Sequence, residues 1–279
     1  MWPLEPPAVS ARHSFDTCVG NTRDRVRREL LAAAGDSIED AGMRFRDAAQ
    51  KGALHGLRTD AFPVPGIGAD DAVRWVYKNG MVEGKGRSIY DELMRAPIHE
   101  RCPMCGHGTV TTLDHFLPKK LFPALCVDPL NLVPACAECN HAKGERVPSS
   151  AETTLLHPYL DRIDQDRWLE ARVVESSPLW LEFFVSPPNS WEQVLSERTK
   201  HHFERFRLAE RFAAQANRTL AGIRRQLTSL LQAGGKEPVR AYLADEAETR
   251  LADRLNGWEG VTYRALAEDD TFCAGGWPQ

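Results

Sequence analysis

Four cysteines near the middle of the 279-residue chain have the spacing of metal ligands. Cys102 and Cys105 form one Cys-x-x-Cys pair, and Cys136 and Cys139 form a second pair after thirty intervening residues. Each tight turn directs two sulfurs at one point, and two such turns complete the tetrahedral four-cysteine shell that Zn²⁺ favours. Because four protein ligands leave no open position for a substrate, we expect this zinc ion to be structural. A redox dithiol and a pair of disulfides are the alternative interpretations.

The polar residues between the two cysteine pairs are suited to hydrolysis assisted by a second metal ion. Asp114 and Asn140 offer a carboxylate and an amide oxygen, the hard ligands that Mg²⁺ and Mn²⁺ prefer. His115 follows Asp114 at the end of a predicted strand, so its ring faces the opposite side and is free to act as a base. One imidazole that deprotonates water and one metal ion that holds a phosphate can hydrolyse a phosphodiester. We therefore expect Mg²⁺ or Mn²⁺ as a catalytic cofactor.

The segment Cys102–Gly144, about a sixth of the chain, resembles the HNH, or ββα-metal, endonuclease family in its zinc-binding cysteine-knuckle form. The resemblance rests on two cysteine pairs, Asp-His, Asn-Leu-Val and Cys-Asn-x-x-Lys, which occur in that order. It implies that Asp114 and Asn140 are ligands of the catalytic metal ion and that His115 is the general base. It also implies that Asn131 braces the loop and orients the catalytic histidine.

Neighbouring residues compete for one of these ligand positions. His141 directly follows Asn140, and a helix turns by about 100° per residue, so both side chains cannot face the same metal ion equally. We prefer Asn140, which directly follows Cys139, the fourth cysteine of the two pairs, as in the family pattern. His141 is kept as the alternative ligand. Lys143 is predicted to contact a substrate phosphate, as are Lys119 and Lys120 in the loop after the base.

These assignments predict a metal-dependent HNH endonuclease that hydrolyses phosphodiester bonds in DNA, with RNA as an alternative substrate. The strings His-Phe-x-Pro-Lys, Phe-Pro-x-Leu and His157-Pro-Tyr159 are similar to those of HNH nucleases of prokaryotic antiphage defence, notably the small subunit of Septu-like systems. That similarity implies a defence role with an ATPase subunit as partner.

Two other classes of protein share parts of this pattern. A non-catalytic zinc-knuckle protein that binds nucleic acid, or serves as an adaptor, is the alternative, although a pure binder has no need of an oxygen-ligand pair beside a base. A zinc deaminase is excluded, because its His-x-Glu would precede the cysteines, whereas His202-Phe-Glu204 follows them.

Composition gives further expectations about location. Hydrophobic residues are 42% and charged residues 27% of the chain, which is typical of a globular protein with a sizeable core. No run of 18 or more apolar residues occurs, so we expect no membrane span, and Met1 to Ser10 does not have the pattern of a secretory signal. Seven cysteines without an export signal indicate a reducing compartment, and we expect the cytoplasm.

The charge pattern points to one candidate surface for nucleic acid. The net charge of −4 argues against a protein that coats nucleic acid with its whole surface. Residues 190–240, however, hold ten Lys or Arg against five Glu, a local net charge of +5. This segment is a candidate contact for a duplex backbone, with a solvated helix face as the alternative.

The predicted fold class is α+β: a mostly helical chain with a small central zinc-bound ββα-metal module and a short β-hairpin after it. The expected regions are a helical one at 1–98, the nuclease module at 99–150, and short strands followed by helices at 151–279. The first twenty residues are expected to form an irregular arm. Strands are predicted over 109–113, 167–174 and 180–185, the last two joined in a hairpin around 176–178. Helices are predicted from residue 21, over 37–54, from residue 70 to the glycine at 80, and over 88–95, 190–231 and 238–255.

Overall fold

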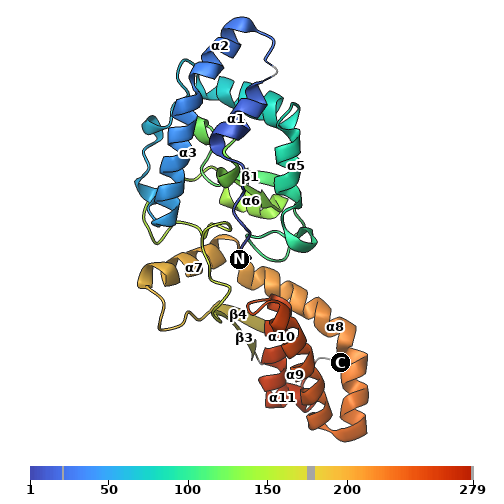
Figure 1. Cartoon of the computed structure of the whole chain (residues 1–279). Coiled ribbons are helices and arrows are strands. Elements are labelled where there is room, and N and C mark those ends of the chain that lie inside the picture. The colour runs from blue at the N-terminus through green and yellow to red at the C-terminus, as the bar shows by residue number, and fades with distance from the viewer. Residues whose placement is uncertain (21, 175–179, 278–279) are drawn as a thin grey trace. The chain divides into compact units, whose positions relative to one another are not determined.

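The computed structural model describes residues 1–20, 22–174 and 180–277 and confirms the predicted α+β class (Figure 1). The described chain is mostly helical and forms two small antiparallel sheets of two strands each. It divides into two compact units, Met1–Arg162 and Ile163–Gln279. The region boundaries expected at residues 99 and 151 mark changes in composition, and both lie inside the first unit. Within the described ranges, no helix is long and apolar enough to cross a bilayer.

The first unit holds all the residues of the predicted site. Its two strands are β1 Thr112–His115 and β2 Leu132–Ala135, and α6 Ala137–Lys143 follows them, which gives the order ββα. Figure 1 shows β1 and α6 between the longer helices α3 and α5. The other helical segments are α1 Ala11–Val19, α2 Arg25–Ala33, α3 Gly35–Gln50, α4 Ala69–Asp71, the π-helix η3 Ala72–Val82, α5 Arg87–Arg95, and the 3₁₀ turns η1 Leu54–Gly56, η2 Thr59–Ala61, η4 Ile98–Glu100, η5 Pro123–Leu125 and η6 Pro129–Asn131.

The first strand begins later than the predicted range 109–113. Thr109 pairs instead with Arg101, and the Val110 N–H donates to the Glu100 carbonyl at 2.8 Å, so both belong to the turn that carries the first cysteine pair. The strand proper includes Asp114, which lies opposite Val133 of β2. The two site residues expected after the strand are therefore part of its ladder, where pairing fixes the direction of their side chains.

The irregular arm expected over the first twenty residues is limited to residues 1–10, because residues 11–19 form helix α1. Ser10 caps this helix, and its hydroxyl oxygen accepts a hydrogen bond from the His13 N–H at 3.1 Å. The Ser14 hydroxyl donates to the Val127 carbonyl at 2.7 Å, inside the protein. This bond ties α1 to the segment between β1 and β2, so the helix is part of the core that surrounds the site.

The helix predicted after residue 70 is for most of its length a π-helix, η3. Its last turn closes with the Glu83 N–H donating to the Lys78 carbonyl at 3.0 Å, five residues back. Gly80 allows this helix to approach α1 closely, because a Cβ atom there would lie 2.7 Å from the Cys18 carbonyl oxygen. The wide helix carries Tyr77 toward β1, as described below.

Asp128, just before η6, is a carboxylate buried beneath α1 and α3. It is 4% exposed, and its Oδ1 accepts a hydrogen bond from the Leu130 N–H at 3.0 Å. A Cβ atom at Gly42 of α3 would lie 3.3 Å from its Oδ2, which shows how closely that helix covers it. Burial raises the pKa of Asp128 to about 6, against the opposing effects of the Leu130 N–H and the Arg46 charge.

We predict that Asp128→Asn removes a pH dependence of stability. The folded protein holds this proton more tightly than the unfolded chain, so wild-type stability should fall as the pH rises from about 4 to about 6, by about 3 kcal/mol, and then level off. Asparagine keeps the acceptor for Leu130 but has no proton to release. Urea unfolding of both proteins between pH 4 and pH 7 measures the difference. The exposed Glu39→Gln on α3 is the control, and parallel curves for Asp128→Asn and wild type would contradict the prediction.

The second unit is a two-stranded sheet covered by helices. Strands β3 Leu169–Val174 and β4 Trp180–Val185 pair antiparallel, as predicted, with Leu169 opposite Val185, while the turn expected at 176–178 lies outside the described residues. The helices are α7 Gln193–Arg205, α8 Leu208–Gly234, α9 Lys236–Asp253, α10 Trp258–Glu268 and α11 Asp270–Cys273. The single helix predicted over 190–231 is thus two helices, because Arg207 between them adopts a left-handed conformation with φ of 51°.

Candidate functional site

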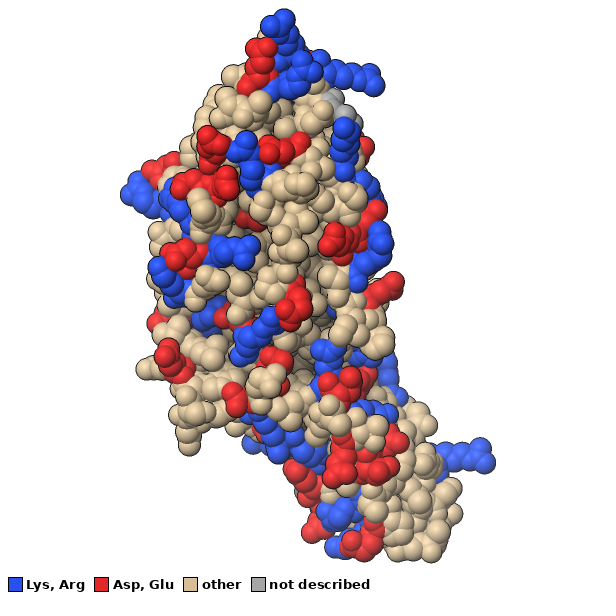
Figure 2. All heavy atoms as spheres, in the orientation of Figure 1, with Lys and Arg blue, Asp and Glu red and all other residues tan. Residues whose placement is uncertain are grey.

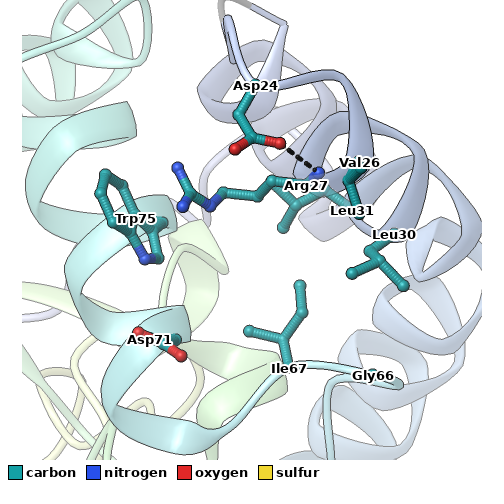
Figure 3. Close-up of a pocket in the computed structure, with 9 residues that line it drawn as sticks. All are labelled: Asp24, Val26, Arg27, Leu30, Leu31, Gly66, Ile67, Asp71 and Trp75. Atoms are coloured by element: carbon teal, nitrogen blue, oxygen red, sulfur yellow. Dashed lines mark hydrogen bonds between the residues drawn. The ribbon is translucent and has the colours of Figure 1, made fainter.

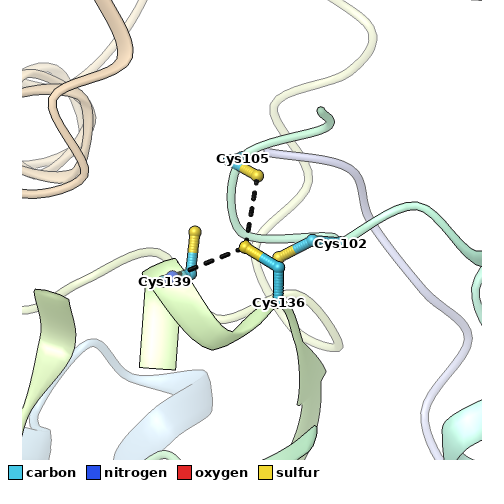
Figure 4. A group of neighbouring side chains, drawn as sticks. All are labelled: Cys102, Cys105, Cys136 and Cys139. Carbon is cyan, nitrogen blue, oxygen red and sulfur yellow. Dashed lines mark hydrogen bonds between the residues drawn. The ribbon is translucent and has the colours of Figure 1, made fainter. Parts of the chain in front are cut away.

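The four predicted zinc ligands converge in the first unit (Figure 4). Cys102, Cys105, Cys136 and Cys139 are buried, and their Sγ atoms all lie within 4.8 Å of one another. Sulfurs around a tetrahedral zinc ion lie about 3.8 Å apart when each bond is about 2.3 Å. The 4.0 Å between the Sγ atoms of Cys105 and Cys136 is close to that spacing. All four are free thiols, so the cluster could hold a metal ion such as zinc.

Backbone N–H groups within both cysteine turns point at sulfur. Gly108 N–H donates to Cys105 Sγ at 3.3 Å, and Cys139 N–H donates to Cys136 Sγ at 3.4 Å. The pKa of Cys136 is lowered, chiefly by the Cys102 thiol and then by the other two thiols, which hydrogen-bond to it. At Cys136, both effects favour the thiolate form that binds metal ions.

The first cysteine turn is closed by Gly106 and covered by the start of the chain. Gly106 has φ of 66°, and a Cβ atom there would lie 2.5 Å from Trp2 Nε1. The backbone N–H of Trp2 donates to the Pro103 carbonyl at 2.7 Å. A residue with a side chain at position 106 would therefore be strained and would displace the tryptophan.

Asp114 lies on the face of β1 that is turned toward α6, and there it forms a buried ion pair. Its Oδ2 atom lies 3.3 Å from Lys143 Nζ, and the two side chains are only 10% and 4% exposed. Burial raises the pKa of Asp114 to about 6, while the charge of Lys143 opposes this shift. Lys143, predicted to contact substrate, thus neutralises Asp114 and also donates to the Gly144 carbonyl at 3.1 Å.

The structure separates the two competing ligand candidates on α6. Asn140 Nδ2 donates to Thr112 Oγ1 at 3.2 Å, and Thr112 shares a face of β1 with Asp114 because the two are two residues apart. Asn140 also shares a face of α6 with Lys143, three residues on. His141, in contrast, is exposed. The interface between α6 and β1 therefore brings Asn140 toward the Asp114 side and leaves His141 outside it.

His115 points to the other face of β1 and is held in one orientation. The ring is 5% exposed, and its Nε2 lies 2.9 Å from the Cys126 carbonyl oxygen. Since a carbonyl only accepts, Nε2 carries the proton and the neutral ring keeps its lone pair on Nδ1. Tyr77 of η3 packs edge-on against it, with 4.6 Å between ring centroids. Burial lowers the pKa of His115 to about 3, and the charge of Lys119 adds to the shift.

Asn131 is fully buried and braces the loop that follows β1. Its Oδ1 accepts from the Leu117 N–H at 2.7 Å, and its Nδ2 donates to the carbonyls of Leu117 and Leu125 at 3.1 and 3.2 Å. Leu125 precedes Cys126, whose carbonyl accepts the bond from His115. The amide is thus connected to the histidine through the backbone of this loop.

The two loop lysines lie in different surroundings. Lys119 Nζ is 5.0 Å from the centroid of the Tyr77 ring, and its charge lowers the pKa of both Asp114 and His115. Asp114 and His115 therefore share one electrostatic neighbourhood although they face opposite sides of β1. Lys120 is more exposed and lies 3.9 Å from the carboxylate of Asp70. Sequence reasoning gave no role to Tyr77, since its contact with His115 depends on the path of η3.

A separate pocket of about 330 Å³ lies between α2, the turn at 66–67 and η3 (Figure 3). The Arg27 guanidinium lies over the Trp75 ring on one side, 3.7 Å from its centroid. Val26 and Leu30, which share an apolar stripe with the buried Leu31, line the pocket and are 68% and 42% exposed. None of the predicted site residues belongs to it.

Fold and site together define a mostly helical α+β protein with a ββα segment and a buried four-cysteine cluster that could hold a metal ion such as zinc. The chain is 30% identical over 216 residues to protein ea31 of Escherichia phage lambda, a match that covers 72% of this chain and 73% of that relative. It belongs to the same protein family as ea31. No family model matches the sequence, and no solved structure matches it.

We predict that the purified protein contains about one zinc ion per chain and that Cys136→Ser loses it. Because metal binding to such a cluster contributes directly to folding, the variant should lose several kcal/mol of unfolding free energy. Elemental analysis and thermal unfolding measure the two effects. Cys273→Ser, at a buried cysteine of the second unit outside the cluster, should keep the metal. A zinc-loaded Cys136→Ser protein of normal stability would refute the prediction.

Proposed function

We propose that this protein is a metal-dependent HNH endonuclease that hydrolyses phosphodiester bonds in DNA. The observation that carries the proposal is the fixed, neutral imidazole of His115, bound through Nε2 to the Cys126 carbonyl. Its lone pair on Nδ1 is available to take a proton from water. The nearby carboxylate of Asp114 and the amide of Asn140 supply the oxygen ligands that such a reaction needs.

Each side chain has a distinct part in the proposed reaction. His115 accepts the proton of the attacking water, and Asn131 keeps the histidine in place through the loop backbone. Asp114 and Asn140 hold Mg²⁺ or Mn²⁺, and their donor set of one carboxylate and one amide oxygen fits these ions. When bound, this metal ion would stabilise the negative charge of the leaving oxygen. The four cysteines hold a structural Zn²⁺, and Lys119 and Lys120 contact phosphates.

A wider biological setting follows from the same resemblance. The strings around His157 and in the loop after the base support a role in antiphage defence beside a partner ATPase, and the seven cysteines support the cytoplasm as its location. A non-catalytic zinc-knuckle protein that binds nucleic acid is the second candidate, and the ion pair between Asp114 and Lys143 favours it, because a neutralised carboxylate does not by itself attract a metal ion. Cleavage assays separate the two candidates.

We predict that the full-length protein nicks supercoiled plasmid DNA in the presence of Mg²⁺ or Mn²⁺ and that His115→Ala slows nicking about 100-fold or more, the usual contribution of a general base. Asn140→Ala should likewise lose activity. His141→Ala is the matched control, because His141 is the exposed neighbour on the same helix and should be dispensable. Zinc content and thermal unfolding verify that each variant is folded. Undiminished nicking by a folded His115→Ala protein would remove this residue as the base.

The second unit offers a candidate surface for the DNA backbone on helix α8. No acidic residue occurs between Arg211 and Gly234, and Arg218 and Arg225, seven residues apart, share one exposed face of this helix. On the face visible in Figure 2, acidic and basic side chains are interspersed, with basic ones also gathered around α2.

We predict that Arg218→Gln/Arg225→Gln weakens DNA binding equally for unrelated sequences. The plot of log affinity against log salt concentration has a negative slope, and each lost phosphate contact should reduce the magnitude of this slope by about 0.9. Fluorescence anisotropy with two unrelated duplexes at several salt concentrations measures this. Arg172→Gln is the control in the same unit, because Arg172 is paired with Glu182. An unchanged salt slope in the double variant means that this face is only solvated.

A further inference from the structure

Lys143 is among the least exposed charged side chains of the first unit. Its side chain is 4% exposed, and a lysine buried to this extent needs a partner of opposite charge. That partner is Asp114, whose Oδ2 lies 3.3 Å from the ammonium nitrogen. The charges of the pair cancel, and each side chain lowers the cost of burying the other.

The ammonium group lies directly beside the carboxylate oxygen that the proposed function assigns to a divalent metal ion. It approaches from α6, the element that also carries Asn140, the second proposed ligand. A divalent ion bound next to Asp114 with Lys143 in place would set three positive charges against one negative charge in a buried space. Repulsion at such short range is strong wherever water is excluded.

We propose that Lys143 is an internal counter-ion that a divalent metal ion must displace from Asp114. The inference rests on the proposed function, because it takes Asp114 as a metal ligand. The free protein then binds the catalytic metal ion weakly. Metal binding becomes tight when the ammonium group moves to another anion, and a phosphate of the substrate is the anion at hand.

The local backbone permits this movement. Lys143 is the last residue of α6, and the helix ends at Gly144, which has φ of 63°. The next two residues, Glu145 and Arg146, are exposed. A lysine with four flexible methylene groups at such a helix end can redirect its ammonium group without moving β1 or the ligands.

The test is a Mn²⁺ titration of the full-length, zinc-loaded protein, in which free Mn²⁺ is followed by electron paramagnetic resonance. Lys143→Gln should bind Mn²⁺ at least about tenfold more tightly than wild type, because the competing charge is gone. Lys143→Arg keeps the charge and should bind as weakly as wild type. Lys119→Gln is the matched control, because this lysine acts on Asp114 without contacting it. It should change the affinity less than Lys143→Gln does.

Stability gives a second measurement that does not depend on activity. Without metal, Lys143→Gln leaves the buried Asp114 unpaired and should lower the melting temperature, whereas Asp114→Asn/Lys143→Gln should recover part of the loss. Mn²⁺ should then raise the melting temperature of Lys143→Gln by more than that of wild type. If Lys143→Gln proves too unstable to titrate, this larger shift remains the readout.

The outcomes separate this inference from the proposed nuclease activity. Equal Mn²⁺ affinities of Lys143→Gln, Lys119→Gln and wild type overturn the counter-ion role, even if the protein cleaves DNA. Tighter binding by Lys143→Gln alone supports that role, even if no cleavage occurs and the nuclease proposal fails. Absence of Mn²⁺ binding in Lys143→Gln as well as in wild type overturns the counter-ion role, and the plasmid nicking assay then decides separately on the nuclease activity.

Discussion

The convergence of four sulfurs is the constraint on which the rest of the first unit depends. Cys136 stands at the junction of β2 and α6, and Cys139 lies in the first turn of that helix, while Cys102 and Cys105 belong to the turn before β1. Once these points are joined, the strand pairing and the position of α6 against β1 follow. The polar side chains of Asp114 on β1 and Lys143 on α6 then face one another, although a helix of seven residues such as α6 is marginal in isolation.

Hydrogen bonds within the loop between β1 and β2 fix the conformation of this loop. Asn131 uses its amide oxygen and both amide hydrogens on the backbone of this loop, so its contribution is to geometry rather than to charge. The loop in turn presents the Cys126 carbonyl to His115 and the Val127 carbonyl to Ser14 of α1. The orientation of one imidazole thus depends on contacts from three parts of the chain. Loss of the amide would be felt at the histidine although the two side chains do not touch.

Features that depend on residues close together in the sequence were predictable, whereas features that depend on contacts between distant segments were not. The cysteine cluster was predictable, because the spacing within each pair encodes its own turn. Helix α1 was missed although Ser10 provides a local cap, since its buried face is completed by α3, by η3 and by the distant Val127. The close approach of the π-helix to α1 depends on Gly80, and no local pattern encodes such a contact. For the same reason the partner of Lys143 was not predicted. Lys143 was expected to contact substrate, but it packs from α6 onto Asp114 of β1.

The charges of the site suggest an order of events under the proposed function. Asp114 and Lys143 cancel, His115 is neutral, and Lys119 leaves the resting neighbourhood with one net positive charge. Such a site attracts a phosphate more readily than a metal cation. An arriving phosphate supplies the negative charge that a divalent ion requires, and it offers Lys143 an alternative partner to Asp114. Under the proposed function, substrate and metal ion would therefore favour each other's binding, and the site would become complete only when nucleic acid is present, which would limit unproductive metal binding in the free protein.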